Sequence, residues 1–387
     1  MHFQHPLTSK QPHIGTTIFA VMTGLANQHG AVNLSQGFPN VEVDPKLIAL
    51  VDKHSREGKN QYAPMPGLPL LKEKIAAKIE ESYGAKYHPA NEILITAGAT
   101  LAIYATLSAI VFPGDEVIVI EPAYDCYEPG IKLNGGIPVR TQLTTEMKVD
   151  WPDIQNKISP KTRAIMINTP HNPSGSVLRK EDLLTLEKIV KNTNIIVISD
   201  EVYEHIVFDG ERHESVCRYP SLAERSVVIF SFGKTYHVTG WRLGYCIAPE
   251  NIMKEIVKCH QFQTYCVHTP MQYAVADYID NKEKYLELNS FFQQKRDYFL
   301  SLVKQTKFKV LPCAGTYFQL LSYAHLSDES DREYANRLTI DYKIASIPIS
   351  VFYHNFRDDK ILRFCFAKTD ETLEKGVEGL MKYSLSL

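Results

Sequence analysis

The stretch "RSVVIFSFGKTYHVTGWRLGYCIA", residues 225–248, contains two apolar runs separated by a polar segment with two glycines. The runs "SVVIF" (226–230) and "LGYCIA" (243–248) are nearly continuous, as is typical of strands that are covered on both faces of a sheet. Polar and charged side chains follow the first run directly. In open α/β sheets ligands bind beyond the carboxyl ends of strands, so this segment is the first candidate for a binding site.

Similar runs occur earlier in the chain. They are "EILIT" (92–96), "EVIVI" (116–120), "RAIMIN" (163–168) and "NIIVIS" (194–199). Helical patterns alternate with them, such as residues 68–84, which end at Gly84, and the segment that Pro113 and Gly114 terminate. This alternation predicts βαβ units and an α/β protein whose large domain has a mostly parallel, seven-stranded sheet flanked by helices.

A different pattern begins after a long helical stretch near residues 280–305. Strand-like runs here are "FKVLPCAGTYFQLL" (308–321), "IASIPISVF" (344–352) and "ILRFCF" (361–366), before a final helix near 370–385. We expect a smaller α+β domain. The predicted division is 1–44 as an N-terminal arm and part of the small domain, 45–285 as the large ligand-binding domain, and 286–387 as the small C-terminal domain.

Composition and charge favour a small-molecule partner. The net charge is only −2 and no block of like charges is present, so neither nucleic acid nor an anionic membrane is an expected partner. The N-terminus lacks the apolar core of a signal peptide, and no run approaches eighteen apolar residues. The seven cysteines are scattered without a C-x-x-C pair and the histidines show no metal spacing, which predicts a cytoplasmic protein without a metal site.

Residues 233–235, Gly-Lys-Thr, are like the end of a phosphate-binding P-loop. Val228, however, stands where that loop requires a glycine, so a P-loop nucleotide site is excluded. Other polar groups also follow predicted strands. They are Gly98, Ala99 and Thr100 at the start of a helix, Asn172 in "TPHNPSG", Asp200 and Tyr203 after "NIIVIS", and Ser231, Lys234 and Arg242.

Alone, each of these residues has an ordinary structural explanation. Lys234 could be a solvated surface lysine, Asp200 a helix cap and Tyr203 an amphipathic surface ring. Together at the ends of one sheet, they suit a phosphorylated pyridine aldehyde. A lysine amine bonds to such an aldehyde, a carboxylate pairs with its ring nitrogen, and serine, arginine and a helix N-terminus bind its phosphate.

The chain resembles the class I/II pyridoxal-phosphate-dependent aminotransferases, which have the aspartate aminotransferase fold, fold type I. The resemblance covers nearly the whole chain. It rests on "NQYAPMPGLPLLK", "TAGAT", "EPAYDCYEP", "NTPHNPSG", "ISDEVYEHIVF", "SFGKTYHVTGWRLGY" and "ILRFCFAK", in the order and spacing of the family. "EPAYDCYEP" and "RFCFAK" are similar to the bacterial methionine aminotransferases and the kynurenine aminotransferase/glutamine transaminase group.

The resemblance implies a role for each cofactor-binding residue. Lys234 would carry pyridoxal 5'-phosphate covalently, Asp200 would pair with the ring nitrogen, and Tyr203 and Asn172 would bond to the ring oxygen. Tyr124 would stack on the ring. The phosphate would be held by Ser231, Arg242, and the backbone at Gly98, Ala99 and Thr100. Tyr62 would reach the phosphate from a neighbouring subunit, which implies a homodimer with shared active sites.

The resemblance also implies a substrate site. Arg363 would bind the substrate α-carboxylate as a bidentate pair, with Asn172, Gly37, Phe19 and Tyr62 as further substrate-binding residues. His268 is a further candidate from a partner chain. Without the resemblance, a buried structural ion pair would be the preferred explanation of Arg363. Arg242 stands where some kynurenine-group relatives have lysine; both cations can hold a phosphate, but only the guanidinium does so bidentately.

The expected reaction is ping-pong transfer of the α-amino group of an L-amino acid to a 2-oxo acid. Residues 11–40 contain no arginine that could bind a second carboxylate, which favours methionine, glutamine or aromatic and kynurenine-type donors over aspartate. The alternative is a pyridoxal-phosphate-dependent C–S β-lyase with the same cofactor site. A regulator with a basic helix-turn-helix extension and a dehydrogenase with G-x-G-x-x-G are disfavoured, because neither motif is found.

Overall fold

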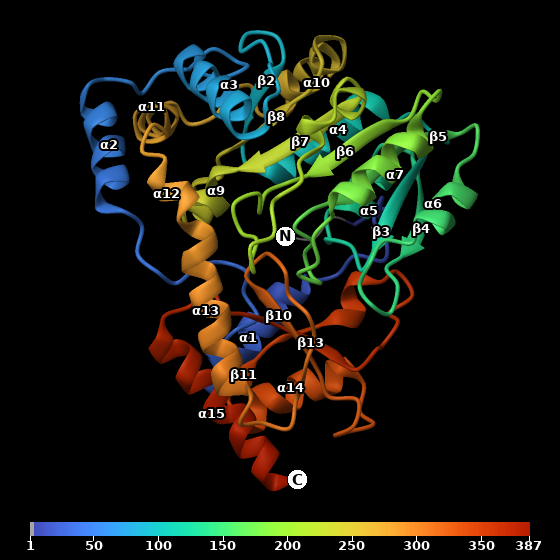
Figure 1. Ribbon diagram of the computed structural model, residues 1–387, viewed down its shortest axis with the longest axis vertical. Helices are drawn as coiled ribbons and strands as arrows, with labels where there is room; N and C mark the ends of the chain where they lie inside the picture. The colour runs from blue at the N-terminus through green and yellow to red at the C-terminus, as the bar shows by residue number, and fades with distance from the viewer. Residues whose placement is uncertain (1–3) are drawn as a thin grey trace.

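The computed structural model describes residues 4–387 (Figure 1). Its central element is a seven-stranded sheet with the order β2-β8-β7-β6-β5-β3-β4. The strands are β2 Ile93–Thr96, β3 Glu116–Glu121, β4 Ile137–Gln142, β5 Thr162–Asn168, β6 Ile196–Asp200, β7 Ser226–Ser231 and β8 Gly244–Ile247. Strands β3 to β7 pair in parallel, whereas β8 is antiparallel to both of its neighbours. The predicted α/β class and mostly parallel seven-stranded sheet are confirmed.

The apolar runs form central strands because helices cover both faces of this sheet. Along β7, Val227 and Ile229 enter one apolar cluster, while Val228 and Phe230 enter the other. Complete burial of such a side chain stabilises the fold by roughly 1.5–3 kcal/mol, so a continuous apolar run favours a strand covered on both faces. The flanking helices are α3 Pro69–Tyr83, α4 Ala99–Ile110, α5 Tyr127–Leu133, α6 Trp151–Lys157, α7 Lys180–Val190 and α10 Glu250–Gln263.

The C-terminal third of the chain builds a separate antiparallel sheet with the order β12-β13-β10-β9. Its strands are β9 Lys309–Val310, β10 Phe318–Ser322, β12 Ile347–Pro348 and β13 Ile361–Cys365. Helices α14 Asp331–Asp341 and α15 Asp370–Ser386 pack beside it, and the long helix α13 Leu288–Val303 runs down to it from the larger sheet (Figure 1). This arrangement places the smaller sheet opposite the strand ends of the larger one.

The N-terminal segment contains a helix that the sequence patterns did not indicate. Helix α1, Ile18–His29, begins after Thr17, whose hydroxyl accepts from the amide of Ala20 at 3.3 Å, and ends at Gly30, which has a φ of 60°. Only Met22 and Ala26 are buried along it, so its apolar periodicity is weak. Tertiary contact positions it, because strand β1 (Val32–Asn33), which follows it, pairs in parallel with β11 (Ile344–Ala345).

The remaining helices connect these layers. They are α2 Pro45–Arg56, α8 Pro220–Ala223, α9 Phe232–Thr235, α11 Thr269–Tyr278, α12 Glu283–Leu286 and the short 3-10 helices Val216–Arg218, Thr239–Trp241 and Ile349–Phe352. Within residues 4–387, no helix combines the length and the apolar character that a membrane crossing requires. The same residues contain no cluster of three or more His, Cys, Asp or Glu side chains that could hold a metal ion.

Candidate active site

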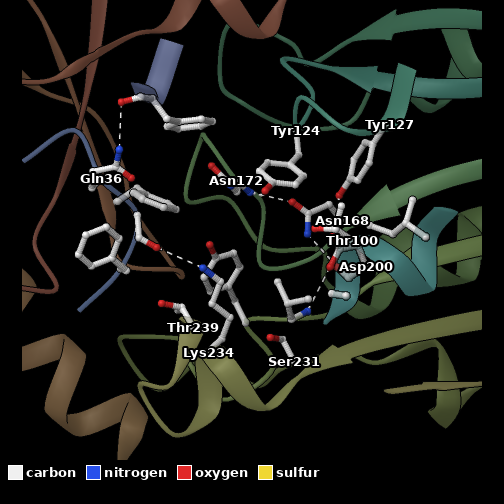
Figure 2. Close-up of a pocket in the computed structure, with 18 of the residues that line it drawn as sticks. Gln36, Thr100, Tyr124, Tyr127, Asn168, Asn172, Asp200, Ser231, Lys234 and Thr239 are labelled. Carbon is white, nitrogen blue, oxygen red and sulfur yellow. Dashed lines mark hydrogen bonds between the residues drawn. The ribbon is translucent and has the colours of Figure 1, made fainter. Parts of the chain in front are cut away.

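A cavity of about 350 Å³ lies between the carboxyl ends of the parallel strands and the smaller sheet (Figure 2). Strands β5, β6 and β7 end at the same edge, so their terminal residues and the turns after them converge there. All of the predicted site residues except Gly98, Tyr62 and His268 line this cavity: Phe19, Gly37, Ala99, Thr100, Tyr124, Asn172, Asp200, Tyr203, Ser231, Lys234, Arg242 and Arg363.

Lys234 lies on helix α9, which begins directly after β7. Its Nζ donates to the hydroxyl oxygen of Tyr317 at 2.8 Å and to the carbonyl oxygen of Gly37 at 3.2 Å. Burial lowers the pKa of Lys234 to about 8. An amine with that pKa is partly unprotonated near neutral pH, and so it can act as a nucleophile or as a base.

Asp200 ends strand β6 and is buried. One carboxylate oxygen accepts from the hydroxyl of Tyr127 at 2.7 Å, and the other accepts from the amide of Val202 at 3.3 Å. Burial raises the pKa of Asp200 to about 6, although both hydrogen bonds act in the opposite direction. No ion pair to Asp200 is formed within residues 4–387, so its environment suits a cationic ligand group such as a protonated ring nitrogen.

The start of helix α4 forms an anion cradle with Arg242. Gly98, which precedes the helix, has a φ of 81°, and no side chain caps the first turn. A Cβ at Gly98 would lie 2.6 Å from Nη2 of Arg242, so only glycine allows this close approach. Gly98 does not line the cavity, but it brings a guanidinium to the positive end of a helix. Two positive groups with Ser231 nearby fit a phosphate.

Arg363 is a buried cation on β13, with only 1% of its surface exposed. Its guanidinium carbon lies 3.9 Å from the ring centroid of Phe318. Nη1 donates to Oδ1 of Asn172 at 2.7 Å and Nη2 donates to the carbonyl oxygen of Ser35 at 3.2 Å, while the buried Nε has no hydrogen-bond partner among the described residues. Within residues 4–387 no carboxylate pairs with Arg363. A structural ion pair therefore does not explain this arginine, and its donors fit a ligand carboxylate.

Aromatic and amide groups close the other side of the cavity. Figure 2 shows Tyr124 and Asn172 across the cavity from Lys234 and Ser231. The ring of Tyr203 is buried and packs edge-on against Tyr317, with ring centroids 5.2 Å apart. Burial also raises the pKa of Tyr203, so its hydroxyl stays protonated and can donate a hydrogen bond at neutral pH.

Two aromatic candidates for the site lie outside this cavity. Tyr62 is 81% exposed, and its ring packs edge-on against Tyr265 at 5.3 Å between centroids. His268 caps helix α11, where its Nδ1 accepts from the amide of Met271 at 3.3 Å. Both residues are exposed, so a single chain does not bring them to its own cavity.

Several cavity residues were missed from the sequence. Tyr127, which bonds to Asp200, stands three residues after Tyr124 in "EPAYDCYEP", and this helical spacing was an available signal. Tyr317 does not line the cavity but bonds to Lys234. It stands directly before strand β10, in an apolar run with no such signal. Gln36, Phe38 and Asn168 also line the cavity.

Comparison with known proteins identifies the family. The family model described as "Aminotransferase class I and II" matches residues 30–380. The chain belongs to the class I and II aminotransferases. This aminotransferase is 46% identical to the methionine aminotransferase of Escherichia coli over 96% of this chain and 97% of that protein. It is 34% identical to the kynurenine–oxoglutarate transaminase of Dictyostelium discoideum, over 95% and 94% of the two chains.

Solved structures agree with this aminotransferase in fold. The Escherichia coli methionine aminotransferase superimposes with a TM-score of 0.96 at 45% identity, covering 98% of this chain and all of that one. The N-succinyldiaminopimelate aminotransferase of Mycobacterium tuberculosis gives a TM-score of 0.94 at 34% identity, with coverage of 98% and 100%.

The protein is therefore an amino acid aminotransferase, and its family uses pyridoxal phosphate. Its own residues fit that cofactor, since the cavity combines an amine, an unpaired buried carboxylate and an anion cradle. The relatives give no support to the alternative of a C–S lyase.

Proposed function

We propose that this aminotransferase transfers the α-amino group of an L-amino acid with an apolar or aromatic side chain to a 2-oxo acid, with pyridoxal phosphate held covalently by Lys234. Methionine is the first candidate donor, followed by glutamine and kynurenine-type amino acids. The observation that carries the proposal is the convergence of Lys234, Asp200 and Arg363 on one cavity. The names of the most similar relatives support the choice of donors.

The cofactor would be held at both ends. Arg242, Ser231 and the amides of Ala99 and Thr100 would bind its phosphate, and Asp200 would pair with its ring nitrogen. Tyr203 and Asn172 would hydrogen-bond to its ring oxygen, and Tyr124 would cover the ring. When bound, pyridoxal phosphate supplies an aldehyde that links to amines and a protonated ring that withdraws electrons from the substrate Cα.

Lys234 would move the proton. As the free amine, its Nζ takes the proton from Cα of the bound amino acid and then carries it as the ammonium. Tyr317 and the carbonyl of Gly37 accept hydrogen bonds from Nζ, so they hold it in place during this step. Burial assists the base role, because it lowers the pKa of Lys234 to about 8.

Arg363 would bind the α-carboxylate of both substrates. The guanidinium is already desolvated and stacked on Phe318, so little further ordering is required when a carboxylate binds. The hydrogen bond from Arg363 to Asn172 fixes the orientation of the guanidinium group. A bidentate pair with a carboxylate also fixes the amino acid in one orientation relative to Lys234.

The positively charged residues of the cavity bear on which substrate side chain it accepts. Within residues 4–387, its lining contains only three lysines or arginines, which are Lys234, Arg242 and Arg363. All three have a role in the proposed reaction, so no cation is left for a second carboxylate. Phe19 and Phe38 add aromatic surface. This lining supports an apolar or aromatic side chain, although apolar contacts alone discriminate weakly among such substrates.

The proposal includes a homodimeric assembly and a cytoplasmic location. Tyr62 would reach the phosphate of a neighbouring subunit in a homodimer, and its exposure on the single chain supports that role. We keep the predicted domain division at residues 44 and 285, which is compatible with the separate positions of the two larger sheets. All seven cysteines are unpaired, which favours the predicted cytoplasmic location.

The test is a visible absorption spectrum of the purified protein, with and without borohydride, compared with the spectrum of Lys234→Ala. The wild type should show a band that borohydride removes, and the variant should lack it. Incubation with methionine and a 2-oxo acid should then yield the oxo acid of methionine. Pyruvate and a thiol released from a cysteine conjugate, without amino transfer, would instead indicate the lyase.

A further inference from the structure

Lys368 is a buried lysine whose only hydrogen-bond partners within residues 4–387 are backbone carbonyls. It follows strand β13 and is 3% exposed. Its Nζ donates to the carbonyl oxygen of Phe38 at 2.8 Å and to that of Gln36 at 3.3 Å. The same Nζ lies 4.7 Å from the ring centroid of Phe38. The lysine therefore holds one short segment by two carbonyls and one ring.

Burial of this ammonium without a carboxylate has an energetic cost. Within residues 4–387, no Asp or Glu lies within ion-pair distance of Lys368. A buried ammonium is unfavourable unless polar groups face it, and here two backbone carbonyls and the ring of Phe38 stand in place of a carboxylate. A methionine of similar length would fill the same space without that cost. The positive charge of Lys368 therefore has a role that an apolar side chain of the same size could not fill.

The segment that Lys368 holds, Gln36 to Phe38 (the 36–38 wall), lines the cavity. The carbonyl between the two that Lys368 binds is that of Gly37, which accepts from Nζ of Lys234 at 3.2 Å and from the hydroxyl of Tyr317 at 2.7 Å. A Cβ at Gly37 would lie 2.8 Å from the ring of Phe318, so the wall packs directly on the residue that stacks against Arg363. Displacement of the wall would therefore alter both ends of the proposed substrate site.

The 36–38 wall makes no backbone–backbone hydrogen bond within residues 4–387. Before it, the amide of Cys365 donates to the carbonyl of Leu34 at 2.8 Å, and after it the amide of Asn40 donates to the carbonyl of Ala367 at 3.2 Å. Between these two points, side chains bind the carbonyls of the wall, and Lys368 binds two of the three.

We propose that Lys368 is a positioning residue that fixes the 36–38 wall and thereby determines how tightly the enzyme binds its amino acid. This inference rests on the proposed function, because it assumes that the amino acid binds between the wall and Lys234. The wall is ordered before the substrate arrives. Without Lys368, part of the binding energy of the substrate must be used to order the wall. The apparent affinity for the amino acid therefore falls, while the rate of the chemical step is unchanged.

The test compares Lys368→Met with Lys368→Arg and with a matched control, Lys72→Met. Lys72 is also buried, at 4% exposed, and its Nζ donates to a backbone carbonyl, that of Ala90 at 2.9 Å, but it does not line the cavity. Amide hydrogen exchange of residues 35–40 is measured on the cofactor-free proteins. KM and kcat for methionine are measured on the holoenzymes.

In Lys368→Met, exchange of residues 35–40 should be about tenfold faster or more, and KM should rise about tenfold with kcat changed less than about threefold. Lys368→Arg should restore both values, and Lys72→Met should change neither. Unchanged exchange, or faster exchange with an unchanged KM, would overturn the inference. If the methionine variant does not fold, Lys368→Gln must show the same direction of change. A wild type inactive on every proposed donor contradicts the proposed function instead, because exchange is measured independently of activity.

Discussion

The guanidinium of Arg363 donates a hydrogen bond of 2.7 Å to the side-chain oxygen of Asn172. Arg363 lies on the smaller sheet, whereas Asn172 lies in the turn after β5 of the larger one, and both side chains are buried. This contact therefore links the group proposed to bind the substrate carboxylate to the group proposed to bind the ring oxygen of the cofactor.

Substitution of Arg363 by lysine should weaken the binding of both substrates. The ammonium cannot make the bidentate pair or stack on Phe318, and a hydrogen bond between charged groups contributes about 1.5–3 kcal/mol. We expect KM for the amino acid and for the oxo acid to rise by roughly a hundredfold in steady-state assays. Arg357→Lys is the control, since Arg357 bonds to Asp359 and Gln142 outside the cavity and should leave KM unchanged.

The amine of Lys234 should titrate near pH 8 in the cofactor-free protein, because burial lowers its pKa to about 8. Its reactivity toward an amine-acylating reagent should therefore rise as the pH passes that value, as followed by mass spectrometry of the labelled peptide. Tyr317→Phe should move the midpoint lower. The variant loses an acceptor that stabilises the ammonium, while the burial that disfavours the charge remains. A midpoint unchanged by the substitution would show that Tyr317 does not stabilise the ammonium.

Substitution of Tyr127 by phenylalanine should weaken cofactor binding. The hydroxyl of Tyr127 donates to Asp200 at 2.7 Å and helps to keep that carboxylate ionised against the effect of burial. Without this donor the pKa of Asp200 should rise above about 6, and its pairing with a ring nitrogen should weaken. We expect a Kd for pyridoxal phosphate roughly tenfold higher, measured by absorbance titration, with the largest loss below neutral pH. An equal loss at all pH values would contradict this assignment.

Substitution of Lys78 by methionine should destabilise the fold. Its Nζ pairs with Glu204 at 2.5 Å, and both side chains are buried. Burial acts to raise the pKa of Glu204, but the ion pair with Lys78 and the neighbouring His205 ring together outweigh it and hold that pKa below its usual value. Loss of one partner leaves a buried charge and costs about 3–5 kcal/mol, which urea denaturation at neutral pH should detect.

The loss caused by Lys78→Met should depend on pH in a defined direction. In the wild type the lowered pKa of Glu204 stabilises the fold above the unfolded value of about 4.3, and that contribution is lost as the pH falls. In the variant, Glu204 keeps the Tyr83 hydroxyl and the His205 ring but loses its ammonium partner. Burial should then raise its pKa, so its protonation relieves the unpaired charge. The difference in unfolding free energy should therefore shrink between pH 7 and pH 5. A constant difference would indicate lost packing instead.

Sequence patterns predicted the elements of the fold in which consecutive side chains are buried. The run at residues 226–230 is typical of a strand covered on both faces, and it lies in β7. Helix α1 escaped prediction because just two of its residues are buried and its position depends on contacts far along the chain. Apolar residues recur at helical spacing only where a helix buries a whole face. A helix that buries few side chains therefore cannot be predicted from this spacing.

The sequence by itself determined the parts of the site that follow strands. Asp200 and Ser231 are the last residues of parallel strands, and Asn172 and Lys234 follow such strands. The ends of these strands meet at one edge, so the convergence of the four residues is a consequence of local pattern and sheet topology. Only the tertiary structure decided what surrounds them. The hydrogen bonds from Lys234 to Tyr317, from Arg363 to Asn172 and from Lys368 to the 36–38 wall join residues that are 83, 191 and more than 300 positions apart. Such contacts depend on how two separate sheets pack against each other, and no local pattern of residues encodes that packing.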